Sequence, residues 1–270
     1  MAALRRAACA LLVAVSLFAP PPATATAYST DQSDLWWTDP PSSENGWGFQ
    51  LVQRGSVIFA TIFVYGTTGT PTWYVATMGP AGGATWSGDL YTTTGPWFGT
   101  MPYNPALFTF RKVGTMTWAA QTSTTGTLTY DVDGLTIVKN VTRQTLVLDD
   151  YSGTYLGAIH FTSSGCTNPS DNTPPVDAPL TTISVTQSGQ SISITISILG
   201  LAITISGTLS QSGRFGSVLG TYTATGGEIG NASVSTLDVQ VNALTATFVL
   251  TSTNLGCQDT GYFAGMRSRP

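Results

Sequence analysis

The sequence predicts an all-β protein made of two antiparallel meander domains, the second of them a small closed barrel. Short segments rich in β-branched and aromatic residues recur between Gly, Pro and Asn breaks. The composition changes near Asp149-Asp150, from Trp, Phe and Pro before it to Ser, Thr, Ile and Gly after it. In the second half, one hairpin register sorts aliphatic from hydroxyl side chains. We therefore expect domains at residues 28–148 and 149–270.

The chain begins with the pattern of a secretory signal peptide, residues 1–27. Arg5 and Arg6 precede an apolar run from Ala7 to Phe18, and small residues lead to a cleavage site near Ala27. We expect a secreted or periplasmic protein. The apolar run is too short to span a bilayer and no later stretch approaches the required length, so no transmembrane helix is expected. Losing both arginines takes the net charge from −4 to about −6, which argues against a nucleic-acid partner.

In the first domain, Gly55-Ser56 and Asp133-Gly134 have the residues of two-residue hairpin turns. The long interruption from Thr92 to Ala106 contains three large aromatic residues and three prolines, so it is too apolar for a free linker. We expect it to fold over one end of the sheet as a lid or plug. The expected strands are Phe49–Arg54, Val57–Tyr65, Thr72–Met78, Ala84–Tyr91, Leu107–Arg111, Val113–Ala119, Thr125–Val132 and Leu135–Leu146.

The second domain contains a hairpin whose register can be predicted. A two-residue turn at Leu199-Gly200 pairs Ile198 with Leu201, and the pairing continues outward as Ile196 with Ile203 and Ile194 with Ile205. The intervening pairs are Ser197 with Ala202, Thr195 with Thr204 and Ser193 with Ser206. This register places the aliphatic groups on one face of the hairpin and the small or hydroxyl groups on the other, and a shifted register would mix them.

Two of the three cysteines remain once the signal is removed, because Cys9 lies inside it. In an exported protein, Cys166 and Cys257 most simply form one disulfide. Cys166 follows the first expected strand of the second domain, Tyr151–Phe161, and Cys257 precedes the last, Thr260–Arg267. In a closed barrel with an even number of strands these two strands are antiparallel neighbours, so both sulfurs fall at the same rim.

The first domain resembles a module of exported bacterial proteins. The shared residues are Trp36-Trp37, Pro40 and the run from Glu44 to Gly48, which reads Glu-Asn-Gly-Trp-Gly here and Glu-Ser-Gly-Trp-Gly in the module. The resemblance continues through Pro71-Thr72-Trp73 to the end near Arg143, about half of the mature chain. It implies an envelope or extracellular setting. The second domain is loosely similar to calycin-type barrels such as avidins and lipocalins, in layout only.

Candidate catalytic and metal-binding groups are few. His160 is the only histidine, and no Gly-x-Ser-x-Gly nucleophile elbow accompanies it. One histidine without a free thiol does not make a zinc site. Asp131 to Gly134 resembles the start of a calcium loop but lacks the later oxygen ligands, so a tight turn is expected there. Glu44 could join a carboxylate pair for glycoside hydrolysis, with Asp39, Asp89 or Asp131 as partner, or it could fix its own loop.

All seven tryptophans lie between Trp36 and Trp118, which indicates either an aromatic core or a surface that stacks on a ligand. Trp73 and Tyr74 alternate along one strand and so point to opposite faces. Core packing is the alternative role for most of these rings. The residues that we expect to contact a ligand are Trp36, Trp37, Glu44, Trp47, Trp73 and Trp97.

We interpret the chain as an exported, non-enzymatic binding protein that presents an aromatic cavity or rim to a small apolar or carbohydrate ligand, without metal, cofactor or catalytic residues. Three alternatives stay open. They are a structural or interaction protein such as an inhibitor or surface-assembly component, a glycoside-acting enzyme using Glu44, and an outer-membrane barrel. The last requires the aliphatic face of the Ile192 to Ile205 hairpin to point outward to lipid. The sequence determines neither the ligand nor the oligomeric state.

Overall fold

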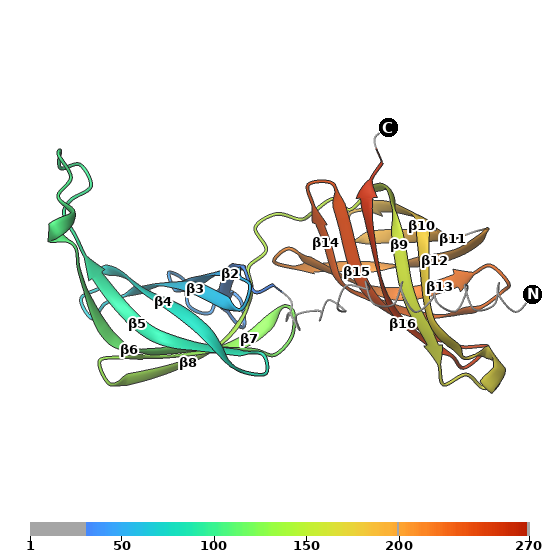
Figure 1. Ribbon diagram of the computed structural model, residues 1–270, viewed down its shortest axis with the longest axis horizontal. Coiled ribbons are helices and arrows are strands. Elements are labelled where there is room, and N and C mark those ends of the chain that lie inside the picture. Colours follow the sequence, from blue (N-terminus) through green and yellow to red (C-terminus); the bar gives the residue numbers. More distant parts are fainter. Residues whose placement is uncertain (1–30, 199, 269–270) are drawn as a thin grey trace, which may run out of the picture. The chain divides into compact units, whose positions relative to one another are not determined.

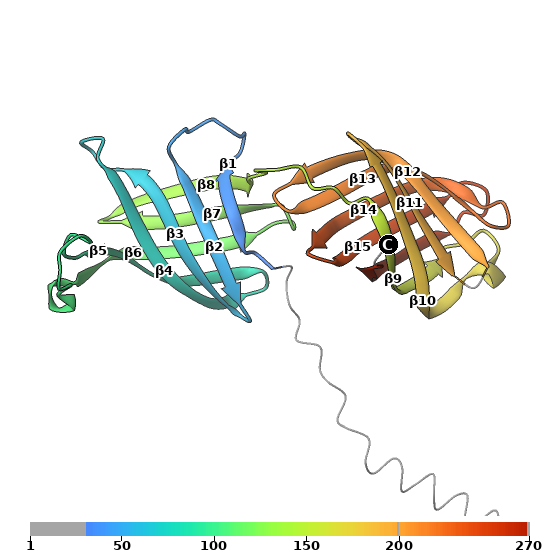
Figure 2. The ribbon, with the colours of Figure 1, turned by 90° about the horizontal axis from the view of Figure 1, so that it is seen from above.

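The computed structural model describes residues 31–198 and 200–268. The expected signal peptide, Cys9 and the cleavage site near Ala27 lie outside the described residues. Within those residues the protein is all-β and forms two closed antiparallel barrels of eight strands each (Figures 1 and 2). No helix in the described part of the chain is both long enough and apolar enough to cross a membrane.

The first barrel closes because β1 pairs with both β2 and β8: Trp36 lies opposite Phe49 on one side and opposite Arg143 on the other. The elements are β1 Asp34–Thr38, β2 Gly48–Arg54, β3 Val57–Tyr65, β4 Pro71–Gly82, β5 Thr85–Thr94, the 3-10 turn η1 Pro105–Leu107, β6 Thr109–Ala120, β7 Thr125–Val132 and β8 Leu135–Arg143. The antiparallel meander and both two-residue turns are confirmed.

Two strand assignments in this barrel were wrong. The first strand, β1, contains the Trp36-Trp37 pair and was not expected as a strand. The separate strands expected at Leu107–Arg111 and Val113–Ala119 form the single strand β6. The break expected at Lys112 is a one-residue register shift within β6, because Leu90 pairs with Gly114 and the next residue, Tyr91, pairs with Lys112.

The interior of the first barrel is filled with aromatic side chains. Trp36 packs against Trp118 with ring centroids 4.6 Å apart, and Phe49 packs against Trp118 at 5.6 Å. The Trp36 indole N–H donates to the carbonyl oxygen of Gln32, 3.1 Å away, so the buried polar atom has an acceptor. The crowding of tryptophans in the sequence is therefore in part a core, as the alternative interpretation allowed.

The segment expected to cover the barrel as a lid does not cover it. β5 and β6 extend together to the pair Thr94 and Thr109, and the residues between them project beyond the barrel end (Figure 1). Their large apolar side chains are exposed, with Trp97 at 68% and Phe98 at 86%. The continued ladder holds this β5–β6 arm, residues 92–110, away from the mouth.

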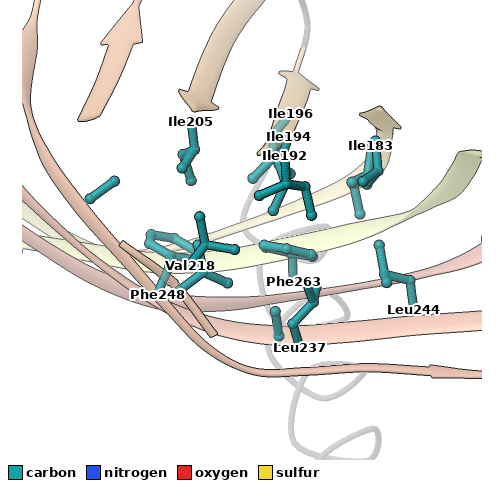
Figure 3. Packing of buried hydrophobic residues seen from close by; sticks show 14 of the residues in the cluster. Ile183, Ile192, Ile194, Ile196, Ile205, Val218, Leu237, Leu244, Phe248 and Phe263 are labelled. Atoms are coloured by element: carbon teal, nitrogen blue, oxygen red, sulfur yellow. The ribbon is translucent and has the colours of Figure 1, made fainter. Parts of the chain in front are cut away.

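The second barrel closes through β9, which pairs with both β10 and β16. Its interior is mainly aliphatic, with side chains from opposite walls in contact (Figure 3). The elements are β9 Gly153–Ser164, the 3-10 turn η2 Pro169–Asp171, β10 Thr173–Ser188, β11 Ser191–Ile198, β12 Leu201–Ser212, β13 Phe215–Ala224, β14 Ile229–Gln240, β15 Ala243–Ser252 and β16 Gln258–Arg267.

The expected hairpin register is confirmed pair by pair in β11 and β12. Ile194, Ile196 and Ile205 are buried in the barrel interior, and the hydroxyls of Thr195 and Thr204 lie 3.2 Å apart on the outer face. Leu201 differs, since it lies exposed next to the turn. This arrangement is the reverse of the one that the outer-membrane alternative required of the hairpin, because the aliphatic side chains point inward.

The Cys166–Cys257 disulfide is confirmed, at the rim where β9 ends and β16 begins. The backbone beside it is also paired, since the Thr167 N–H donates to the carbonyl oxygen of Leu255 at 2.9 Å. The cross-link closes a loop of 91 residues, and in the chain-entropy description this lowers the entropy of the unfolded chain.

The inward and outward faces of β11 give a direct test of the register. Replacing the buried Ile194 by Ala is expected to lower the free energy of unfolding by about 2–5 kcal/mol, because it leaves a cavity in a packed interior. The adjacent Thr195→Ala on the outer face is the matched control, with an expected change within about 0.5 kcal/mol. Urea unfolding followed by far-UV circular dichroism measures both, and equal losses in the two variants would contradict the register.

Candidate ligand cavity at the mouth of the first barrel

A cavity of about 690 Å³ opens at one end of the first barrel. Its walls come from three connections at that end: the segment between β1 and β2, the segment after β3, and the turn between β7 and β8. Side chains of β3, β4, β7 and β8 complete the lining. The volume is in the range of sites that enclose small organic molecules.

Four aromatic side chains line this cavity: Trp47, Tyr65, Tyr74 and Tyr130. The Trp47 indole N–H donates to the Tyr130 hydroxyl oxygen at 3.1 Å, which fixes the orientation of both rings. Burial raises the pKa of Tyr130, the Trp47 hydrogen bond opposes that rise, and the nearby Glu44 charge adds to it. The Tyr130 phenol therefore stays neutral and can still donate a hydrogen bond.

A carboxylate and an ammonium group meet at the cavity edge. Lys139 Nζ lies 2.5 Å from Glu44 Oε1 and 2.6 Å from Oε2, so the ammonium contacts both carboxylate oxygens. The Lys139 side chain is 20% exposed and the Glu44 side chain 45%. The pair connects the β1–β2 segment to β8 and leaves this edge polar without a net charge.

Gly46 is the residue that allows the loop to enter the cavity wall. Its φ of +93° lies in the region that side chains rarely adopt, and a Cβ at this position would collide with the Tyr65 ring. The backbone conformation therefore favours glycine, and the absence of a side chain also lets the Tyr65 ring lie against the loop. Asn45, the residue that departs from the Glu-Ser-Gly-Trp-Gly pattern, also lines the cavity.

The six residues expected to contact a ligand are not all brought together. Glu44 and Trp47 line the mouth cavity. Trp36 is buried in the core, and Trp37, its neighbour along β1, points to the opposite face. Trp73 lies on the outer wall opposite Phe63 and is 52% exposed, while Trp97 is in the β5–β6 arm.

None of the three carboxylates considered as catalytic partners of Glu44, Asp39, Asp89 and Asp131, lines the mouth cavity, and two of them have other contacts. Asp89 pairs with Lys112 at 2.6 Å, and Asp131 accepts hydrogen bonds from the hydroxyls of Thr115 and Thr136. Asp133 does line the cavity, and the Arg111 guanidinium binds both of its oxygens. The expected tight turn at Asp133-Gly134 is confirmed, since both residues have positive φ.

His160 lies on the outer face of β9. Its Nδ1 is 2.7 Å from Asp177 Oδ1 on β10, and its ring stacks on Tyr262 of β16 at 5.0 Å between centroids. These are cross-strand contacts, because both partners lie directly opposite it in the sheet. Across the described residues, no group of three or more His, Cys, Asp and Glu side chains is arranged to hold a metal ion.

Sequence reasoning missed Tyr65, Tyr74, Tyr130 and Lys139. A signal for Lys139 existed, because Leu135, Ile137, Lys139 and Val141 alternate on one strand face after a recognised turn. A lysine within an inward row is either paired or functional. No comparable signal marked Tyr65, which is 59% exposed and enters the wall only because Gly46 approaches it.

The second barrel has its own buried carboxyl near the disulfide. Asp259 is 9% exposed, and burial is the main cause that raises its pKa, with a hydrogen bond from Ser163 opposing and the Glu228 charge adding to the rise. Tyr222 donates to Glu228 Oε1 at 2.7 Å, and burial likewise raises the Tyr222 pKa. Burial thus makes the ionised form of Asp259 less favourable in the folded protein than in the unfolded chain.

Comparison with known proteins assigns no family. No family model and no curated protein matches the chain. A crystal structure of a candidate outer membrane protein from Bacteroides fragilis NCTC 9343 is similar at 16% sequence identity and a TM-score of 0.34, over 78% of this chain and 89% of that one. This TM-score is too low to indicate a shared fold, so nothing about this chain follows from that protein.

The raised pKa of Asp259 predicts a pH-dependent stability. Between about pH 4 and the raised folded pKa, the unfolded chain has released this proton while the folded protein retains it, so folding stability is lost as the pH rises through that window. Asp259→Asn is therefore expected to raise the thermal unfolding midpoint at neutral pH and to have no such effect below about pH 3. Scanning calorimetry across that range measures it, and a destabilised variant at neutral pH would contradict the assignment.

Proposed function

We propose that this chain is an exported, non-enzymatic binding protein that takes a small apolar or carbohydrate ligand in the mouth cavity of its first barrel. The observation that carries the proposal is the composition of that cavity. Trp47, Tyr65 and Tyr74 offer ring faces, and the Tyr130 hydroxyl, Asn45 and the Glu44–Lys139 pair offer hydrogen-bonding groups around them. Apolar walls with a few fixed polar groups are the usual construction of a small-molecule site.

The same geometry favours binding over hydrolysis. A glycoside-acting site needs two carboxyl groups flanking the bond, one of them able to exchange a proton with the leaving group or water. Both oxygens of Glu44 are held by Lys139, and those of Asp133 are held by Arg111. The two carboxylates at this mouth are thus occupied by cations and serve as fixed hydrogen-bond acceptors.

The expected position of the ligand makes Trp47 the decisive residue. Intrinsic tryptophan fluorescence, titrated with a panel of mono- and oligosaccharides and of small aromatic and aliphatic compounds, is expected to respond to at least one class. Trp47→Ala should weaken the affinity for that ligand by about tenfold or more, because it removes a stacking face and the hydrogen-bond partner of the Tyr130 hydroxyl.

Trp73→Ala is the matched control, since it removes the same side chain from the outer wall of the same barrel. It is expected to leave the affinity unchanged. Equal losses in the two variants, or a full panel without any response in the wild type, would contradict a site at this mouth.

The export part of the proposal rests on the amino-terminal pattern and is supported by the disulfide, because such cross-links persist mainly in oxidising compartments. A bacterium expressing the full chain is expected to hold it outside the cytoplasm, with a mature amino terminus at or near Tyr28 and the Cys166–Cys257 bond formed. Cell fractionation with intact-mass analysis measures all three. A full-length, reduced protein in the cytoplasm would contradict this part of the proposal.

A further inference from the structure

The β5–β6 arm carries a run of large apolar side chains that are at least half exposed. There are seven of them: Trp97, Phe98, Met101, Tyr103, Leu107, Phe108 and Phe110. The arm stands clear of the barrel end in both views (Figures 1 and 2). An exposed apolar surface of this kind marks a site of contact with a membrane or with another molecule.

The arm carries no charge. The sequence from Thr92 to Phe110 contains no Asp, Glu, Lys, Arg or His. The first cations lie at its base, where Arg111 is paired with Asp133 and Lys112 with Asp89. No ionised side chain therefore has to be desolvated when the arm leaves water. The charged groups remain at the level of the barrel.

The arm is also ordered before any contact is made. Tyr91 packs against Phe110 with centroids 5.8 Å apart, Phe108 against Phe110 at 6.2 Å, and Trp97 against Phe98 at 5.6 Å. The arm satisfies part of its own backbone, since the Phe108 N–H donates to the Pro105 carbonyl oxygen at 3.1 Å and the Thr100 N–H to the Trp97 carbonyl oxygen at 3.0 Å. Internal pairing of this kind is what apolar surroundings demand of a backbone.

We propose that the β5–β6 arm inserts into the interfacial region of a lipid bilayer, with Trp97 and Phe98 as the leading side chains. Tryptophan and tyrosine are enriched at the water interface of membranes, where a ring can be buried while its polar edge stays hydrated. A charged side chain is costly to move toward hydrocarbon, and this arm has none along its length, which favours a bilayer as the occupant. Because the chain is acidic, the attraction comes from apolar contact and not from anionic lipid.

The mouth cavity lies at the same end of the barrel as the arm, because in an up-and-down meander the β1–β2, β3–β4, β5–β6 and β7–β8 connections share one end. An inserted arm would bring that mouth close to the bilayer surface. The insertion itself depends only on the arm, so it stands or falls independently of any ligand in the cavity.

Sedimentation of the mature chain with phosphatidylcholine vesicles tests the proposal. The wild type is expected to bind, and the double variant Trp97→Ser with Phe98→Ser to bind at least about tenfold more weakly, since each ring contributes roughly a factor of ten when buried. The matched control removes two even more exposed apolar side chains of the second barrel, through Leu180→Ser and Val241→Ser, and should bind like the wild type.

A second readout locates the contact. Phosphatidylcholine brominated on its acyl chains is expected to quench wild-type tryptophan fluorescence, and the conservative Trp97→Phe should keep vesicle binding while losing most of the quenching. Adding phosphatidylglycerol should not strengthen binding. The proposal is overturned if the wild type does not bind vesicles, or if the double variant binds them like the wild type. The proposal is also overturned if the wild type forms an oligomer in gel filtration, the double variant does not, and neither protein binds vesicles. In that case the arm contacts protein and not lipid.

Discussion

Closure of each sheet on itself is the constraint from which the rest of the molecule follows. β1 pairs on both sides in the first barrel and β9 does so in the second, so neither sheet keeps an open edge. Once a sheet has closed, every second side chain of each strand must fit inside the same barrel interior. Large rings such as Trp36 and Trp118 fill the first barrel, and isoleucines such as Ile194 and Ile205 fill the second. With such interiors, binding groups belong at the barrel ends.

The ends are where the two barrels differ. In the first, Gly46 lets the β1–β2 segment approach Tyr65, and the Glu44–Lys139 pair joins that segment to β8, which leaves an aromatic cavity with a polar edge. The fourth connection at this end takes no part in the cavity walls and forms the uncharged arm. In the second barrel, one rim carries the disulfide and the buried Asp259. The same barrel construction thus carries the proposed binding cavity at one end of the first barrel and a covalent cross-link at one rim of the second.

The sequence could predict what depends on alternation alone. The β11–β12 register followed from the spacing of isoleucine and threonine. The disulfide followed from the two cysteines that remain after the signal, and its place at one rim followed from strand parity. The sequence could not show whether a given apolar side chain packs in the core or lies exposed. Trp36 and Trp97 have the same side chain, but one is in the core and the other is exposed. The arm was expected to fold onto the barrel because its composition demands cover, and composition does not say whether that cover is the protein itself. Tyr65, at the end of β3, lines the cavity beside Gly46 of the β1–β2 segment, and the sequence does not reveal this contact.

The most direct test of the account is nuclear magnetic resonance of ¹⁵N-labelled protein, observing the indole N–H signals during titration with a ligand that the fluorescence panel identifies. The account predicts that the Trp47 signal moves, because its N–H lies in the cavity wall on Tyr130, while the signal of Trp36, bonded to Gln32 in the filled core, stays in place. A ligand that shifts the Trp36 signal and leaves the Trp47 signal in place would show that the ligand binds in the barrel interior and not at the mouth.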